Sequence, residues 1–563
     1  MSEELVRSLI QLLGEKRVFA EKSDLVAYCE DYSHTLSYEE FRQWPLCAVL
    51  PESAEEVSEI VKLAIRHGTP IVPRGGGSSQ VGGVIPSEGC IVLSTSKMNK
   101  VLDIDAVNLT VTTQSGVNLK KMDEILEPHG LILAQEQGSY RVANIGGAVS
   151  TNGYSMRHNR YGNIGDNVLS MEVVLGDGRI LRTGRKVRSN SSGYPLHKIF
   201  VGAEGTLGII TELTLRVMPK PEVEVALFAT FDSWESAKMT ALKIMQKGLG
   251  FSGGYCVRGI YPELGTDKVI NTIVVGVEGN REEAVATKKV LTSLLKESGG
   301  SLLGEKEAFA IWRQNRSMWC GTAREDYAID DLVAIMPFQY YEEAYARIER
   351  DIFPKYGLKT DSEASRVITI GYRPLTAFDF TYDAKKLSQA DKQKAMGEMI
   401  TVVAEYGGVG AGCHAIGMML RDYFGIEHDP VRFAVMVPAE KLPDASRATI
   451  ADAVLADAAV VAELLTFRAV EIVSSLVSAI AALALMSALT ITPAAMAVAK
   501  DPVPLPVTSP VRVIVWSPVF VPLRFDPVTA PVAAIVDEAV TVVAATVEGL
   551  LAPSDVFVMP TAE

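Results

Sequence analysis

The chain has 563 residues, of which 48% are hydrophobic and 22% charged, a balance typical of a globular protein with more than one domain. Its 68 acidic residues outnumber its 54 basic ones and leave a net charge of -14, which argues against a nucleic-acid-binding protein. The six cysteines lie singly, without a Cys-x-x-Cys pair, so neither a zinc ribbon nor an iron–sulfur cluster ligated within the chain is expected.

The chain opens with an amphipathic segment in which Leu5, Leu9 and Leu12 recur at helical spacing after an acidic start. A secretory signal would need a basic start and a continuous apolar stretch instead. We therefore predict a helical N-terminal segment, residues 1–44, and a cytoplasmic location.

From residue 45 to residue 221, short apolar runs alternate with helical spacing. The expected strands are 45–51, 70–73, 90–93, 109–114 and 171–175, and the expected helices are 53–67 and 119–126. A Gly-Asp-Gly sequence after the last strand predicts a hairpin turn. This region is expected to be an α/β domain with a layered sheet.

In residues 222–430, a strand precedes each of the first three helices. The expected strands are 223–229, 271–278 and 332–336, and the expected helices are 234–248, 281–298, 341–356 and 389–406. The simplest interpretation is a second domain, in which helices cover a sheet.

The last segment, 431–563, is predicted to be an atypical tail, because the composition changes abruptly. Residues 451–563 contain 24 Ala and 23 Val but one Gly, and residues 472–499 carry no charge. Since about 20 apolar residues cross a bilayer, 472–491 is a candidate membrane span. Two alternatives stay open: an Ala/Val-rich segment that is packed or poorly structured, and a tail that is not a natural continuation of the chain.

A glycine-rich loop directly follows the strand expected at 70–73. Its residues are Arg74, Gly75, Gly76, Gly77, Ser78 and Ser79. Consecutive glycines let the backbone turn several N–H groups toward one point, which suits a pyrophosphate. The chain has no Walker sequence, so a Walker-type nucleotide site is excluded.

Two further segments of small residues come later in the chain. The first contains Gly138, Ser139, Ile145, Gly146, Gly147 and Asn152, and the second contains Gly205 and Ile209. Loops of this kind let the backbone approach a large planar ligand along its length. The three segments together predict a site for an extended cofactor.

Six sequence segments, in this order and at this spacing, resemble a known family. They are PESAEEV, PRGGGSS, GSYRVANIGGAVSTNG, RYG, EVVLGDGRIL and VGAEGTLGIITELTL. Residues 45–219 are similar to the FAD-binding domain of the vanillyl-alcohol oxidase and p-cresol methylhydroxylase (PCMH) superfamily. Within it they most resemble the glycolate oxidase D subunits and D-lactate dehydrogenases.

The resemblance implies an α+β fold: a PCMH-type FAD-binding domain of two α/β subdomains, residues 45–221, and a substrate or cap domain, residues 222–430. It places the FAD pyrophosphate at residues 75–79 and the rest of the cofactor near the two later segments. Relatives often attach the flavin through a His near the first glycine loop. Residues 74–80 contain no His, so a non-covalent FAD is expected, although His158 leaves the question open.

Related 2-hydroxy-acid dehydrogenases carry a metal site made of two His and one Glu. Counted back from Tyr382, the two His positions fall here on Ile370 and Ala377, and the Glu position, in a later turn, falls on Cys413. Ile and Ala cannot ligate a metal, so no metal site of the usual kind is expected.

The resemblance places His414 at the family's base position. A neutral imidazole near pH 7 suits the removal of a hydroxyl proton while a hydride leaves the carbon. Arg316 resembles the family's substrate-binding Arg, although its spacing differs by one residue. Arg373, next to Tyr372, could hold an acid or a phenolate.

These features predict an FAD-dependent oxidoreductase that removes a hydride from a small hydroxylated substrate, favoured to be a 2-hydroxy acid of the glycolate or D-lactate type. One alternative substrate is a para-substituted phenol or benzylic alcohol, which the missing metal ligands favour. Another alternative is a catalytically silent FAD-binding accessory subunit. An oxidase needs an electron acceptor, and oxygen, a quinone and a partner protein all remain open, as does membrane association through the tail.

Overall fold

The computed structural model describes residues 2–33, 43–189, 191–315, 328–360, 364–383 and 385–428. All of them belong to one compact unit, 1–455. The predicted tail, its candidate membrane span at 472–491 and Arg316 lie outside the described residues. Among the helices that are described, none is long and apolar enough to cross a bilayer.

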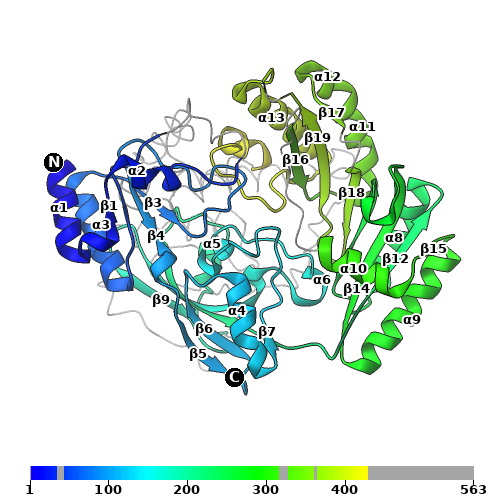
Figure 1. The fold of residues 1–563 in the computed structure, drawn as a ribbon, viewed down its shortest axis with the longest axis horizontal. Coiled ribbons are helices and arrows are strands. Elements are labelled where there is room, and N and C mark those ends of the chain that lie inside the picture. The colour runs from blue at the N-terminus through cyan, green and yellow to red at the C-terminus, as the bar shows by residue number, and fades with distance from the viewer. Residues whose placement is uncertain are drawn as a thin grey trace, which may run out of the picture. The chain divides into compact units, whose positions relative to one another are not determined.

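The first sheet has four strands in the order β1-β2-β4-β3. These are β1 (Val18–Phe19), β2 (Cys47–Val49), β4 (Ile91–Ser94) and β3 (Ile71–Arg74). Helices α1 (Ser2–Leu13) and α3 (Ala54–His67) pack on it through one apolar core, as Figure 1 shows in blue. Helix α3 begins where the Ser53 hydroxyl accepts from the Glu56 amide and ends at Gly68, which adopts a φ of 61°.

The second sheet is antiparallel, in the order β5-β6-β10-β8-β9. Its strands are β5 (Val101–Asp105), β6 (Thr110–Gln114), β10 (Ile209–Arg216), β8 (Val168–Val174) and β9 (Ile180–Gly184). The pairing of β8 with β9 confirms the predicted hairpin. Helices α4 (Leu119–Leu126) and α5 (Ile145–Ser150) cover this sheet. We call residues 2–219, with both sheets, the N-terminal half.

Shorter elements complete the N-terminal half. They are α2 (Lys22–Leu25), α6 (His158–Tyr161), α7 (His197–Phe200), and the paired strands β7 (Leu131–Ile132) and β11 (Met218–Pro219).

Residues 222–428, the C-terminal half, form one eight-stranded sheet in the order β15-β12-β14-β13-β18-β19-β16, with β17 paired to β19. Its strands are β12 (Val223–Phe231), β13 (Gly253–Gly259), β14 (Ile270–Gly279), β15 (Ser301–Leu302), β16 (Ala328–Ala334), β17 (Lys359–Thr360), β18 (Ala364–Ile370) and β19 (Thr376–Tyr382). Its helices are α8 (Trp234–Gln246), α9 (Arg281–Glu297), α10 (Glu305–Asn315), α11 (Tyr341–Asp351), α12 (Phe353–Tyr356) and α13 (Gln389–Glu405).

Alternate residues of this sheet face opposite sides, as strand geometry requires. Ile368 packs into the core under α8, α9, α11 and α13, whereas its neighbour Val367 packs with α10 and with Tyr154 of the N-terminal half. The second face of the sheet is therefore the one turned toward the N-terminal half. Together these layers confirm the predicted α+β class.

The structure contains elements that the sequence did not predict, among them β10, β18, β19 and α10. Three further differences have a local physical reason. The helix predicted at 341–356 is two helices, because Pro354 lacks the amide that a continuous helix needs and starts α12 instead. Strand β13 was not predicted, since its glycines hide the strand pattern; a Cβ at Gly253 would lie 1.8 Å from the Met156 carbonyl oxygen. The small-residue segment that contains Gly146 and Gly147, expected as a loop, contains helix α5.

Candidate active site

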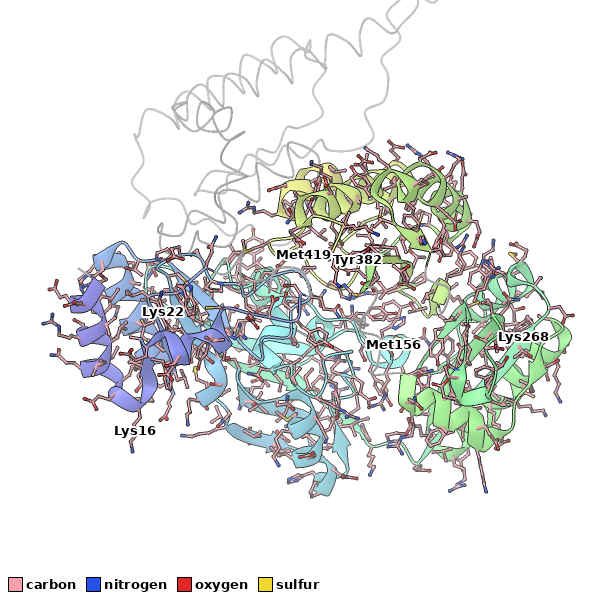
Figure 2. The ribbon with its side chains drawn as sticks, turned by 45° about the horizontal axis from the view of Figure 1, so that its top comes forward. Lys16, Lys22, Met156, Lys268, Tyr382 and Met419 are labelled. Carbon is pink, nitrogen blue, oxygen red and sulfur yellow. The ribbon has the colours of Figure 1, made fainter. Side chains whose placement is uncertain are left out.

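A cavity of about 400 Å³ lies between the two halves of the described chain. The N-terminal half contributes the glycine loop and the segment around Gly138, while the C-terminal half contributes the exposed face of its sheet and the turn after α13. Met156 also lines the cavity and is labelled in Figure 2 at the junction of the halves. The site is therefore built from residues more than 300 positions apart in the sequence.

A second cavity of about 80 Å³ continues the first into the N-terminal half. Both are lined by Gly75, Ser79, Val84, Gly147 and Thr151, so the two cavities are adjacent. Together the two cavities form an elongated site, the shape expected for an extended cofactor.

The glycine loop packs so tightly that side chains are excluded. A Cβ at Gly76 would lie 2.1 Å from the carbonyl oxygen of Val142, and one at Gly77, where φ is 69°, would lie 2.3 Å from Arg74. The amides of Gly76, Gly77 and Ser78 donate to no other described residue. Free amides in a loop that lines a cavity make an anion-binding concavity.

Most of the predicted cofactor-binding residues line one of the two cavities. Those in the larger cavity are Gly75, Gly76, Gly77, Ser78, Ser79, Gly138, Ser139 and Gly147; those in the smaller are Arg74, Gly75, Ser79, Gly146, Gly147, Gly205 and Ile209. Ile145 and Asn152 line neither: Ile145 is fully buried in the core, and the side chain of Asn152 packs near Gly165. Gly146 is glycine because a Cβ there would lie 2.6 Å from the Ser115 Cβ.

His158, considered above as a possible attachment site for the flavin, is not among the described residues that line the large cavity. Its side chain is fully buried, with Nδ1 3.1 Å from the Ser155 carbonyl and Nε2 3.2 Å from the Tyr154 hydroxyl. Burial lowers the pKa of His158 to about 4. Both ring nitrogens are thus engaged by protein groups.

His414 lines the large cavity from the turn after α13. Its Nδ1 lies 3.8 Å from Oδ1 of Asp331 on β16. Burial is the largest influence on the pKa of His414 and favours the neutral ring, but the neighbouring Cys413 and Asp331 outweigh it and raise that pKa to about 10. The structure therefore favours a protonated ring at pH 7, where the sequence suggested a neutral one.

Asp331 and its neighbour Asp330 point to opposite sides of β16. Asp331 lines the cavity, and burial raises the pKa of its carboxyl while the nearby His414 opposes that rise. Asp330 accepts from the buried Lys392 of α13 on the other side. Of the two, Asp331 lines the large cavity and has the larger influence on His414.

Arg373 and Tyr372 contact the N-terminal half. Arg373 donates to Asp166 over 3.1 Å, and the Tyr372 hydroxyl donates to the other oxygen of that carboxylate over 3.2 Å. Neither is among the described residues that line the large cavity. Their predicted role in substrate binding stays a prediction.

The three positions that hold metal ligands in relatives are separated by the fold. Ala377 and Cys413 line the cavity, whereas Ile370 is fully buried in the core on the other side of the sheet. Within the described ranges, no group of three or more His, Cys, Asp or Glu side chains is placed to hold a metal ion.

Several cavity residues were not predicted. They include Tyr154, Arg141, Asp331, Val333, Val367, Thr369 and Leu375. The pairs 331/333 and 367/369 follow the period of two that marks one face of a strand, but the sequence does not say which face meets the cofactor. The Tyr154 hydroxyl lies 2.8 Å from the Thr369 hydroxyl and thus joins the two halves beside the cavity.

Comparison with known proteins agrees with this architecture. Two family models match: an FAD binding domain at residues 45–184 and the C-terminal domain of FAD linked oxidases at residues 220–444. The chain is 31% identical over 381 residues to the D-lactate dehydrogenase of Archaeoglobus fulgidus, covering 66% of this chain and 82% of that protein. It is 28% identical over 451 residues to glycolate oxidase subunit GlcD of Bacillus subtilis, covering 75% of this chain and 90% of that protein.

The fold also matches that of p-cresol methylhydroxylase solved with substrate bound. The TM-score is 0.64 at 19% sequence identity, over 79% of this chain and 96% of that one. At this identity the likeness concerns the fold alone. The sequence motifs, the two family models and the relatives agree: the chain belongs to the FAD-linked oxidases with a PCMH-type FAD-binding domain, and it is an FAD-dependent oxidoreductase.

Proposed function

We propose that this protein oxidises a small 2-hydroxy acid of the glycolate or D-lactate type. The observation that carries the proposal is the pairing of His414 with Asp331 in the cavity that the glycine loop also lines. A group able to take a proton thus faces the same cavity as the loop assigned to the cofactor. The glycolate oxidase and D-lactate dehydrogenase relatives support the substrate class.

FAD fits the residues that are present. The free amides of Gly76, Gly77 and Ser78 suit its pyrophosphate, and the side-chain-free cradle of the glycine loop lets the backbone approach it. When bound, FAD supplies the acceptor for a hydride. His158 is buried and each of its ring nitrogens lies within hydrogen-bond distance of a protein group, which supports a cofactor that is not attached covalently.

In this proposal His414 is the base that accepts the hydroxyl proton of the substrate. With its pKa raised to about 10, the ring is a stronger base than an ordinary imidazole once deprotonated, but a smaller fraction of molecules is active at pH 7. We therefore expect substrate oxidation to speed up as pH rises through the pKa of His414. Asp331 orients the ring and stabilises the imidazolium formed by proton transfer.

The substrate's carboxylate needs a positive partner. Of the described residues that line the cavity, Arg141 and His414 are the ones that can carry positive charge. Arg141 therefore joins Arg316 and Arg373 as a candidate for this role.

The C-terminal wall of the cavity favours a second candidate substrate, a para-substituted phenol or benzylic alcohol. Val333, Val367, Leu375 and Ala377 form an apolar surface beside His414. An apolar wall stabilises an aromatic body better than a small, strongly hydrated acid. In either case a small molecule is the substrate, and a quinone, oxygen or a partner protein takes the electrons in turn.

The test is the visible absorption spectrum of the purified protein, recorded without oxygen before and after adding D-lactate, glycolate and a para-alkylphenol in turn. We expect a flavin band that D-lactate or glycolate bleaches. Bleaching by the phenol alone would establish the second candidate. A flavin band that none of them bleaches would contradict both and favour an accessory subunit.

A further inference from the structure

The turn that carries His414 is attached to both halves of the chain. On the side of the C-terminal sheet, the Gly412 amide donates to the Val333 carbonyl of β16 over 2.8 Å. On the other side, the Met419 amide donates to the Val81 carbonyl, just after the glycine loop, over 3.0 Å. The position of His414 relative to the cofactor cradle thus depends on contacts made by both halves.

One carboxylate makes the central contact with this turn. Oε1 of Glu204 accepts from the Ile416 amide and Oε2 accepts from the Gly417 amide, both over 2.9 Å. Glu204 lies in the loop before β10, and its own amide donates to the Ser150 carbonyl of α5 over 2.8 Å. The same loop lines the smaller cavity, so Glu204 joins the cofactor-binding half directly to the residues next to His414.

The backbone around this contact has little freedom. Glu204 adopts a φ of 52° and Ala415 a φ of 69°, in the left-handed region that residues with a side chain rarely occupy. Gly417 has no space for a side chain, because a Cβ there would lie 2.3 Å from the Val81 carbonyl oxygen. Such conformations persist only where surrounding contacts hold them, and the Glu204 carboxylate supplies two of those contacts.

We propose that Glu204 is a positioning residue: its carboxylate holds the Ile416 and Gly417 amides and thereby fixes His414 in the cavity that the glycine loop also lines. Hydrogen bonds to an ionised carboxylate are stronger than those between neutral groups, and two parallel bonds also fix direction. Burial raises the pKa of Glu204, while the two amides oppose that rise by favouring the charged form. The inference rests on the proposed role of His414 as the proton acceptor.

The principal variant is Glu204→Gln, which keeps the shape but replaces one acceptor oxygen with a donor that faces an amide. Glu204→Asp keeps the charge on a shorter side chain and serves if the first variant folds poorly. The matched control is Asp105→Asn. Asp105 also accepts from two backbone amides, those of Val107 and Asn108, but in an exposed turn between β5 and β6.

The first readout needs no substrate. Hydrogen exchange of a peptide covering residues 413–419 is measured in the FAD-loaded wild type and variants. Glu204→Gln is expected to speed exchange of the Ile416 and Gly417 amides by at least about tenfold, because losing a hydrogen bond to a charged group costs about 1.5 to 3 kcal/mol. Glu204→Asp should give a smaller increase, and Asp105→Asn none. Unchanged exchange in both Glu204 variants would overturn the inference.

The second readout is flavin reduction by the substrate that bleaches the wild type. Glu204→Gln is expected to lower kcat by about 100-fold with little change in KM, because small misplacements of a reacting group have effects of that size. In a His414→Ala background, Glu204→Gln should add little, because its effect passes through His414. An equal further loss in that background would overturn the inference. A wild-type flavin that no substrate bleaches would instead count against the proposed function.

Discussion

The two halves of the active site are encoded in different ways. In the N-terminal half, the cofactor site consists of backbone. Gly76 accepts only glycine because the Val142 backbone fills the space of a Cβ, and Gly77 favours glycine because its φ is 69°. In the C-terminal half, the site consists of side chains such as Asp331, Thr369 and His414, which strand pairing and the turn after α13 bring together. A steric requirement for glycine leaves a readable sequence motif, whereas a wall assembled from separate strands does not.

The largest effect is expected where the backbone itself forms the site. Gly76→Ala places a methyl group 2.1 Å from the Val142 carbonyl oxygen, so the glycine loop must move away from the cofactor. We expect FAD affinity to fall by at least about 1,000-fold, or about 4 kcal/mol, measured by flavin fluorescence during dialysis. The matched control is Gly425→Ala, since nothing lies within 4 Å of a Cβ there. Equal flavin retention by both variants would contradict the assignment of the glycine loop to FAD binding.

The next effect concerns the joint between the halves. Arg157 of the N-terminal half is buried between Glu278 of β14 and Glu136, and Glu278 is 1% exposed. Glu278→Gln leaves a buried guanidinium short of its main partner and should lower the free energy of unfolding by about 3 kcal/mol. The more exposed pair of Arg160 with Glu283 also joins the halves, and Glu283→Gln should cost less than about 1 kcal/mol. Urea denaturation measures the free energy of unfolding of both variants. Equal losses would show that the buried pair stabilises the protein no more than the exposed one.

A smaller effect is expected on the pH dependence of the side-chain half. The Asp331 carboxylate stabilises the protonated form of His414, so Asp331→Asn should lower the pKa of His414. Because the neutral ring is the active base, flavin reduction increases as pH rises through this pKa, and the variant's profile should move to lower pH by about one to two units. Asp330→Asn, on the opposite side of β16, should move it less. A profile that shifts to higher pH, or does not shift, would contradict the assignment.

The smallest effect concerns the apolar wall. Ala377 on β19 pairs with Val333 on β16 and lines the cavity. Ala377→Leu should raise the KM for the substrate by about tenfold while leaving FAD content unchanged, because added volume in a fitted pocket typically changes discrimination by that order. Steady-state kinetics with a parallel flavin assay measures both. An unchanged KM would place the substrate elsewhere in the cavity.

The sequence predicted the N-terminal half well for a physical reason. The glycine loop must follow a strand and must lack side chains, so its residues are both conspicuous and consecutive. The predicted strands and helices of this half are largely present in the structure. Helix α5 was missed because small residues, including Gly146 and Gly147, lower the helical signal.

In the C-terminal half, the contacts that decide chemistry lie far apart in the sequence. The pKa of His414 depends on Asp331, 83 positions earlier, so the sequence alone suggested an ordinary imidazole. The sequence indicates that Arg373 could bind substrate, but it does not indicate that Arg373 donates to Asp166, 207 positions away. Glu204 stood within a recognised motif, but its contact with the His414 turn depends on how the two halves meet.

The most direct test of the account is a stopped-flow comparison of flavin reduction in the wild type and His414→Ala, without oxygen and at matched FAD content. The account predicts that the variant keeps its flavin band and is reduced at least about 100-fold more slowly, because it lacks the group that takes the substrate's proton. Reduction of the variant at the wild-type rate would contradict the assignment of His414, and with it the division of the site into a cofactor-binding and a proton-accepting half.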